Sequence, residues 1–128
     1  MTTTTGAPMT TSLNAEIVDL LQRSQNRIRD PQQWCQQSLE AYDDHEHAVA
    51  WCAIGSVYEE SGFIGIEPTD EAIELGALGR RALDLIAHQM GYNDIAALND
   101  LADHETVMRA FDAAIAQAKS DVAGGGMS

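Results

Sequence analysis

The feature that most constrains this chain is an uncharged run, residues 48–58, in the middle of a strongly charged sequence. The run holds one of the two tryptophans and one of the two cysteines, and acidic residues flank both of its ends. A helix that is apolar on nearly every face is stable only when it is buried. We therefore expect a central helix from about residue 45 to residue 61, with Gly62 as its C-terminal stop.

The charge of the chain is far from balanced. The chain contains seven Lys and Arg residues and 20 Asp and Glu residues, which gives a net charge of −13. No Lys or Arg occurs between Arg29 and Arg80, whereas this interval is rich in carboxylates. Such a surface repels phosphate backbones, so direct nucleic-acid binding is disfavoured. It attracts a protein partner with a basic surface. On the charge alone, a merely soluble acidic protein is the favoured interpretation.

The ends of the chain are expected to lie outside a single folded domain. Residues 1–11 form a Thr-rich segment that is too poor in apolar groups to order itself, and residues 121–128 are Gly-rich. We expect a disordered tail at 1–11, one helical domain at 12–120 and a flexible tail at 121–128. The first residues lack the basic region and apolar core of a signal peptide, and no apolar run approaches the length that spans a bilayer. The expected compartment is the cytoplasm.

The expected redox state of the two cysteines follows from that compartment. Cys35 and Cys52 each lie next to a tryptophan in apolar surroundings. In the cytoplasm both are expected to be reduced. A disulfide between them remains the alternative.

Two helices are expected before the central one. Apolar residues at helical spacing predict a first helix that runs to about residue 29, with Ser12 or Asn14 as its cap. Its apolar stripe is Leu13, Ile17, Leu20, Leu21 and Ile28. Asp30 suits the cap, and Pro31 the first turn, of a short second helix.

Three helices are expected after the central one. Residues 63–66 precede them as an apolar loop pinned to the core. Gly76 and Gly79 lie inside the first of the three, which ends at Gly91, and they indicate close approach by another helix. The expected partner is the central helix, with Gly55 and Ser56 facing the two glycines. The expected N-caps of the three helices are Thr69, Asn93 and Asp103. The fold class is all-α, a compact irregular bundle of four main helices with one or two short ones.

Three segments resemble a known family. They are Trp-Cys-Gln-Gln at 34–37, Ala-Trp-Cys-Ala-Ile-Gly-Ser at 50–56, and Gly-Tyr-Asn-Asp-Ile-Ala-Ala-Leu-Asn-Asp at 91–100 with the Phe-Asp-Ala-Ala-Ile helix that follows. Together they resemble a family of small, uncharacterised helical proteins, a domain of unknown function found in bacterial and bacteriophage genomes. The resemblance covers about residues 13–118. It implies a helical fold and brings no established activity.

The first candidate site is an acidic face at the two ends of the uncharged run. Its residues are Asp43, Asp44, Glu46, Glu59 and Glu60. Carboxylates gathered on one face can imitate the phosphate pattern of a nucleic acid and occupy a protein that binds one. His45 and His47 add imidazole donors, but the ligand spacings of known zinc sites do not occur here. A solvated acidic turn is favoured over a metal site, and no cofactor is expected.

The second candidate site is a polar pocket formed by Cys52, Asn99, Asp100 and His104. A cysteine nucleophile, Cys52 or Cys35, could use His104 as its base, with Asn99 or Asp100 to orient that base. An activated thiolate needs a helix N-terminus or a nearby cation. Cys52 is expected in the middle of the central helix, without either. Helix caps and turns explain the Asn-Asp pairs without a ligand.

We expect a non-enzymatic accessory or regulatory protein that acts through protein–protein contacts. A phage-type inhibitor of a host factor, or a nucleic-acid mimic, is its narrower form. The alternative is a small-ligand or metal-binding domain, with or without catalysis, that uses the polar pocket. A sulfur, His104 and an Asn99 or Asp100 side chain within hydrogen-bonding reach would favour this alternative. The oligomeric state is open, and an exposed Trp34 or Phe63 would indicate a homodimer.

Overall fold

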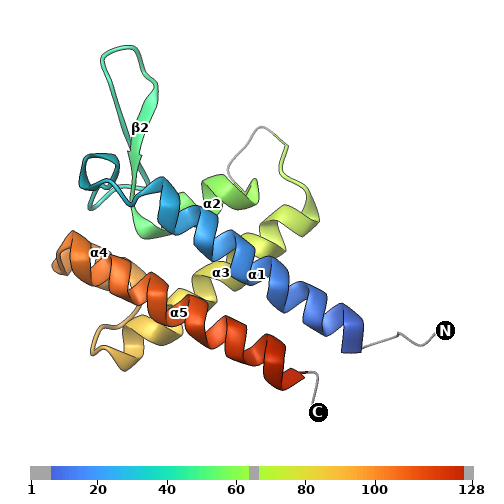
Figure 1. The fold of residues 1–128 in the computed structure, drawn as a ribbon. Helices are drawn as coiled ribbons and strands as arrows, with labels where there is room; N and C mark the ends of the chain where they lie inside the picture. Colours follow the sequence, from blue (N-terminus) through green and yellow to red (C-terminus); the bar gives the residue numbers. More distant parts are fainter. Residues whose placement is uncertain (1–6, 64–66, 126–128) are drawn as a thin grey trace.

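The computed structural model describes residues 7–63 and 67–125 (Figure 1). Most of this part is helical, and a small antiparallel sheet of two strands is added to it. The elements in chain order are α1 (Ala7–Arg27), the 3-10 helix η1 (Pro31–Gln33), β1 (Glu40–Tyr42), β2 (Ala48–Trp51), α2 (Ala53–Ser61), α3 (Asp70–Gln89), α4 (Ile95–Leu101) and α5 (His104–Gly125). The expected helical bundle is right in outline. The sheet corrects the all-α class.

The helices form one packed body from which the strands project. Helices α1 and α5 lie side by side and run in opposite directions, and α3 crosses them (Figure 1). Helix α2 packs against both α1 and α3. The β1–β2 hairpin extends away from this body at the end where α4 lies (Figure 1). None of the helices in the described part of the chain is both long and apolar enough to span a bilayer.

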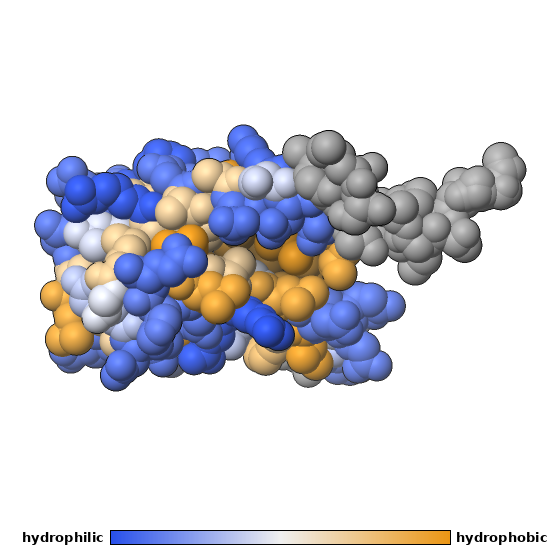
Figure 2. Space-filling view, turned by 90° about the horizontal axis from the view of Figure 1, so that it is seen from below, coloured by the Kyte–Doolittle hydropathy of each residue, from blue (hydrophilic) through white to orange (hydrophobic). Residues whose placement is uncertain are grey.

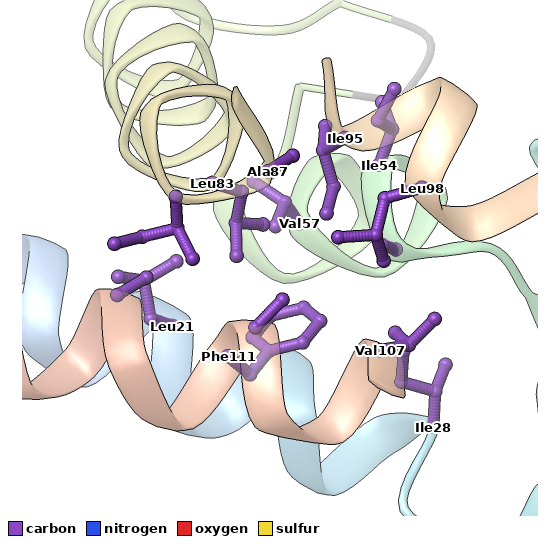
Figure 3. Packing of buried hydrophobic residues seen from close by; sticks show 14 of the residues in the cluster. Leu21, Ile28, Ile54, Val57, Leu83, Ala87, Ile95, Leu98, Val107 and Phe111 are labelled. Carbon is purple, nitrogen blue, oxygen red and sulfur yellow. The ribbon is translucent and has the colours of Figure 1, made fainter. Parts of the chain in front are cut away.

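The core draws side chains from all five α-helices (Figure 3). The largest apolar side chains that are fully buried are Phe111, Leu20, Leu21, Ile28, Leu83, Ile95, Leu98, Val57 and Val107. The stripe expected on the first helix is therefore confirmed in its second half. Its first residue, Leu13, is 38% exposed. Apolar side chains also gather on the face seen from below (Figure 2).

The predicted central helix is wrong in its first half. Residues 48–51 form strand β2, which pairs with β1 so that Trp51 lies opposite Glu40 and Ala50 opposite Ala41. Along β2, Val49 is exposed and Ala50 is buried, the alternation that a strand requires. The helix begins only at Ala53 and ends, as predicted, at Gly62, whose φ is 85°.

The short second helix is also shorter than predicted. Asp30 does act as a cap, because its carboxylate accepts a hydrogen bond from the Gln32 N–H at 2.9 Å. The helical turn nevertheless ends at Gln33, and Trp34 adopts extended backbone angles. Trp34 then forms a parallel bridge with Trp51 of β2. Pairing with a distant strand thus replaces the second half of the expected helix.

Both glycines expected at a close helix contact are confirmed there. A Cβ atom at Gly79 would lie 3.1 Å from Val57 of α2 and 2.9 Å from Leu20 of α1. A Cβ at Gly76 would lie 2.8 Å from the hydroxyl of Ser61, also on α2. Helix α3 can therefore cross α2 closely only because these two side chains are missing.

Gly55 was expected to face those glycines, and this prediction is wrong. A Cβ at Gly55 would lie 2.0 Å from the carbonyl oxygen of Leu39, the residue that precedes β1. The same carbonyl accepts the Cys52 N–H at 3.2 Å. Gly55 thus lets the first turn of α2 lie directly on the base of the hairpin.

The helix caps were predicted with mixed success. Thr69 caps α3 by accepting the Ala72 N–H at 3.0 Å, and Asp103 accepts the Thr106 N–H at 2.8 Å in the first turn of α5, as predicted. Helix α4 is capped by Asp94, one residue after the predicted Asn93. Ser12 and Asn14 lie inside α1 and cannot cap it.

The helical part extends beyond the limits expected from the sequence. Helix α1 already begins at Ala7, so residues 7–11 belong to it, and α5 continues to Gly125. The rest of the expected tails, residues 1–6 and 126–128, and residues 64–66 of the expected apolar loop lie outside the described residues.

Neither aromatic residue considered for a dimer contact is fully exposed. Trp34 and Phe63 are both half-buried. The indole N–H of Trp34 is hydrogen-bonded inside the protein. The Phe63 ring stacks on Tyr58, with 4.2 Å between the ring centroids.

Candidate functional site

Asn99 joins three segments that are far apart in the sequence. Its side chain is 1% exposed. The side-chain oxygen accepts the indole N–H of Trp34 at 2.7 Å and the backbone N–H of Ala53 at 2.9 Å. The amide nitrogen donates to the Cys35 carbonyl at 3.1 Å and to an Asp100 carboxylate oxygen at 3.2 Å. Both ends of the amide are thus occupied by the protein itself.

Residues 36 and 37 continue this contact. The side-chain amide of Gln36 donates to the carbonyl oxygens of Asn99 and Ala102, at 3.1 Å and 3.0 Å. These carbonyls belong to the end of α4, where no intrahelical partner remains for them. The Gln37 N–H donates to Asp100 at 2.7 Å, from a backbone with φ 67°. The segment 34–37 is therefore fixed on the C-terminal end of α4.

The structure brings together three of the four residues predicted for the polar pocket. Cys52, Asn99 and Asp100 line a cavity of about 250 Å³. His104 lies elsewhere. Its Nε2 is 2.7 Å from the Ile28 carbonyl oxygen, to which it donates, and its ring meets the Trp34 ring edge-on at 5.5 Å. The proposed Cys–His pair is not formed.

Cys52 does not lie in the middle of a helix, where it was predicted. Cys52 is the N-cap of α2, not a mid-helix residue, and its sulfur accepts the Gly55 N–H at 3.2 Å. A helix N-terminus ordinarily favours a thiolate. Burial nevertheless raises the pKa of Cys52, and the hydrogen bonds from the Gly55 and Ile54 N–H groups only oppose this effect. The direction of this pKa shift does not support Cys52 as an activated nucleophile.

Cys35 is held in its thiol form even more strongly. Burial, followed by the neighbouring charges of Cys52, Asp100 and Glu40, raises the pKa of Cys35 to about 11. Both cysteines are free thiols. Since a nucleophilic cysteine needs a lowered pKa, neither residue supports the catalytic alternative.

The acidic face predicted from the sequence divides into two parts. Asp43, Asp44 and Glu46 are exposed at the tip of the projecting hairpin (Figure 1). Asp43 also shapes this tip, because its carboxylate accepts the N–H groups of His45 and His47 at 2.8 and 3.0 Å. Among residues 7–63 and 67–125, no three or more His, Cys, Asp or Glu side chains are grouped so that they could hold a metal ion.

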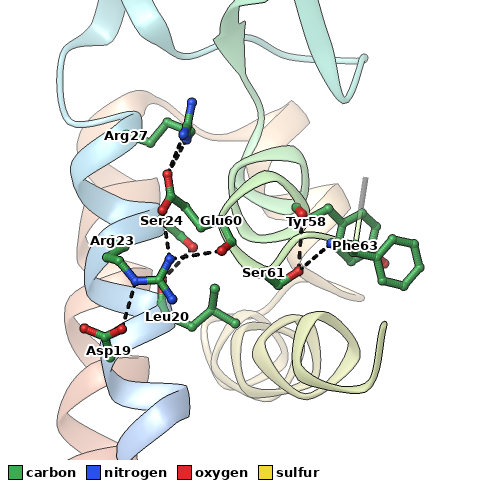
Figure 4. Close-up of polar contacts among 9 residues, drawn as sticks. All are labelled: Asp19, Leu20, Arg23, Ser24, Arg27, Tyr58, Glu60, Ser61 and Phe63. Carbon is green, nitrogen blue, oxygen red and sulfur yellow. Dashed lines mark hydrogen bonds and ion pairs between the residues drawn. The ribbon is translucent and has the colours of Figure 1, made fainter. Parts of the chain in front are cut away.

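Glu60 is mainly an internal ion-pair partner and contributes little to the exposed acidic face. Its carboxylate forms ion pairs with Arg23 at 2.9 Å and with Arg27, and its side chain is 17% exposed (Figure 4). Arg23 also binds Asp19 at 2.8 Å. The negative charge of Glu60 is thus compensated by α1. Sequence spacing could not reveal this, because these arginines lie more than thirty positions away.

Glu59 instead lies near the hairpin. The Tyr42 hydroxyl donates to Glu40 at 2.7 Å. This hydrogen bond and the Glu40 charge, with a smaller contribution from Glu59, raise the pKa of Tyr42. Glu40 and Glu59 therefore extend the acidic surface from the hairpin tip toward α2. Glu40 was not among the predicted site residues.

The comparisons with known proteins identify the family. Residues 13–117 match a family of unknown function, DUF6197. The chain belongs to this family. No curated protein and no solved structure matches this chain. The DUF6197 region runs from α1 to α5, so it includes both the Asn99 contacts and the hairpin.

The pKa of Cys35 in this DUF6197 chain leads to a testable pH dependence. An ordinary thiol, with a pKa of 9.0, reaches its full thiolate fraction soon above pH 9, whereas Cys35 should still be mostly protonated there. We expect its alkylation rate to be about a hundredfold below that of the unfolded chain at pH 8. The rate should keep rising about tenfold per pH unit up to pH 10.

The measurement is iodoacetamide labelling of Cys35 in folded and urea-unfolded protein, read by peptide mass spectrometry between pH 7 and pH 10. The unfolded chain is the internal control, because its Cys35 has lost both the burial and the neighbouring charges. A folded-state rate that levels off near pH 9 would show that the thiol is not held in its neutral form.

Proposed function

We propose that this chain is a non-enzymatic protein-binding domain that uses its β1–β2 hairpin to contact a basic surface on a protein partner. The observation that carries the proposal is the hairpin itself. It projects from the helical body and exposes Asp43, Asp44 and Glu46 at its tip (Figure 1). Opposite charges across an interface speed association and select the partner.

Exposed apolar groups on the same hairpin support an interface. Tyr42 is 60% exposed and Val49 is 43% exposed. An isolated two-stranded ribbon is only marginally stable in water. Here its base is held by the bridge between Trp34 and Trp51. A hairpin that is fixed at its base can bury Tyr42 and Val49 against a partner, while the carboxylates at its tip form ion pairs with basic side chains of that partner.

The narrower form of the proposal concerns the partner. The net charge of −13 favours a partner with a strongly basic surface. A protein that binds nucleic acid carries such a surface, because it must neutralise phosphates. The domain would then act as a regulatory factor of phage type that occupies the nucleic-acid site of a host protein.

A second function is favoured by one observation only. Cys52, Asn99 and Asp100 line a common cavity of about 250 Å³. A small ligand there would have to use Asp100, since the Asn99 amide is already bound at both ends. Asp100 itself already accepts the Gln37 N–H. The protein-binding function is therefore the better supported one.

The hairpin proposal is tested by removing charge from its tip. In the Asp44→Asn/Glu46→Gln variant the turn former Asp43 is kept, so the hairpin should remain folded. We expect affinity for the partner to fall roughly tenfold. The partner is isolated by affinity capture with mass spectrometry, and its binding is then measured at low and at high salt.

The matched control removes two carboxylates elsewhere. Glu16 on α1 and Glu74 on α3 are exposed, and Glu16→Gln/Glu74→Gln leaves the same net charge as the hairpin variant. This control should bind as the wild type does. Equal binding by the wild type and both variants, or binding that is indifferent to salt, would contradict the proposal.

A further inference from the structure

The two cysteines lie next to each other at the base of the hairpin. Trp34 and Trp51 are paired in a parallel bridge, and the Cys35 N–H donates to the Trp51 carbonyl at 3.0 Å. Cys35 and Cys52 are the next residues on these two segments. Side chains of successive residues in an extended chain alternate between faces, so the two thiols follow the tryptophans in register and lie on the same side.

The surroundings of the two residues are shared, which supports this placement independently. The Cys35 sulfur is 3.5 Å from the Ser38 carbonyl oxygen, and the Cys52 N–H donates to the Leu39 carbonyl at 3.2 Å. Both cysteines thus contact consecutive residues of one segment. Asp100 acts on the pKa of both thiols, and the charge of Cys52 acts on the pKa of Cys35.

We propose that Cys35 and Cys52 form a paired oxidation site, which closes to an intramolecular disulfide by exchange with a small-molecule disulfide. The bridge needs no partner protein and does not depend on the binding function. Adjacent extended segments bring cysteine Cα atoms within the range that a disulfide spans.

The exchange proceeds in two steps. Cys35 is half-buried and Cys52 is buried, so Cys35 reacts first. Its thiolate attacks one sulfur of oxidised glutathione and displaces a glutathione thiolate, which leaves a mixed disulfide on Cys35. The Cys52 thiolate then attacks the Cys35 sulfur and displaces the second glutathione thiolate. Two protein thiols are oxidised, one glutathione disulfide is reduced, and the two thiol protons end on the two glutathione molecules.

The disulfide would act on the β1–β2 hairpin. Both strands of the hairpin lie between Cys35 and Cys52 in the sequence. A disulfide closes this segment into a loop and limits its freedom in the unfolded chain. Oxidation thereby fixes the base of the hairpin covalently, whereas reduction leaves it held by hydrogen bonds and packing.

The test uses the full-length chain. The folded protein is incubated with oxidised glutathione at alkaline pH, where part of Cys35 is ionised despite its raised pKa. It is then alkylated with iodoacetamide in denaturant and weighed by mass spectrometry. We expect the wild type to lose the mass of two hydrogen atoms, to take up no alkyl group and to yield a peptide that links Cys35 to Cys52. A wild type that keeps two alkylatable thiols, or that links to a second copy, would overturn the proposal.

Single variants test the order of the steps. Cys52→Ser should stop at the mixed disulfide on Cys35, and Cys35→Ser should react far more slowly, because Cys52 is 7% exposed. Equal reaction of the two variants would overturn the assignment of Cys35 as the entry point.

Thermal unfolding tests whether the bridge fits the folded state. Oxidation should raise the unfolding midpoint of the wild type by roughly 5 °C or more. It should leave the Cys35→Ser/Cys52→Ser variant unchanged, and the circular dichroism spectrum should be the same before and after. A bridge that forms only in denaturant, or that lowers the midpoint, would show that the native geometry does not hold the thiols together.

Discussion

Replacing Gly55 with alanine is expected to lower the free energy of unfolding by about 3 kcal/mol or more. The new Cβ would lie 2.0 Å from the Leu39 carbonyl oxygen and 2.9 Å from its carbonyl carbon. These are backbone atoms, which cannot move aside as a flexible side chain can. Either the first turn of α2 or the base of the hairpin must therefore shift, and the hydrogen bond from Cys52 to Leu39 is lost with it.

The measurement is urea unfolding followed by circular dichroism, with Gly91→Ala as the matched control. Gly91 has φ +98°, but a Cβ there would meet no atom within 4 Å. Its replacement should cost only the strain of a left-handed alanine, about 1 kcal/mol. If the two variants lose the same stability, the contact between Gly55 and Leu39 is not as tight as the structure has it.

Replacing Asn99 with alanine should have an effect of similar size, roughly 3 kcal/mol. The change leaves the indole N–H of Trp34, the Ala53 N–H and the Cys35 carbonyl without their partner. Buried polar groups that lose a hydrogen bond cost about 1–3 kcal/mol each. We also expect the environment of Trp34 to change, which its fluorescence reports.

Two further variants isolate the contribution of Asn99. Asn93→Ala changes an exposed residue that does not cap α4, and it should leave the unfolding free energy almost unchanged. Trp34→Phe removes only one of the partners. In a double-mutant cycle, Asn99→Ala and Trp34→Phe should be coupled by about 1 kcal/mol. Strictly additive effects would mean that their hydrogen bond does not contribute to stability.

Local signals in the sequence were enough to predict most of the helices. Thr69 and Asp103 begin helices where predicted, and Gly62 ends one. A cap could be predicted because it depends on the residue itself and on its neighbours in the adjoining turn. The glycines of α3 were also predictable, since a helix interior rarely contains Gly without a packing reason.

The base of the hairpin could not be predicted in this way. An uncharged run such as residues 48–58 suits a buried helix and a strand equally well. The choice is made by pairing with residues 40–42 and with Trp34, which lie outside the run. The thiol of Cys52 then takes the place of the usual oxygen at the helix cap, a substitution that no cap rule anticipates.

Only part of the candidate site could be predicted, because its remaining contacts also join residues that are distant in the sequence. Cys52, Asn99 and Asp100 were expected together, and they do line one cavity. The bonds that occupy Asn99 come from Trp34 and Ala53, 65 and 46 residues away. Contacts over such separations leave no periodic trace in a single sequence, so the structural use of Asn99 was not visible. Glu60 was misassigned to the acidic face because its arginine partners are equally remote.

The docking of segment 34–37 on the end of α4 has a consequence for how the chain folds. Contacts between residues more than sixty positions apart close a long loop, and they form only after that loop has lost its freedom. Helices α1, α3 and α5 can develop from local contacts beforehand. We therefore expect segment 34–37 and the hairpin to become ordered late, after the C-terminal end of α4 has formed. The hairpin base therefore becomes ordered only once the distant end of α4 is in place.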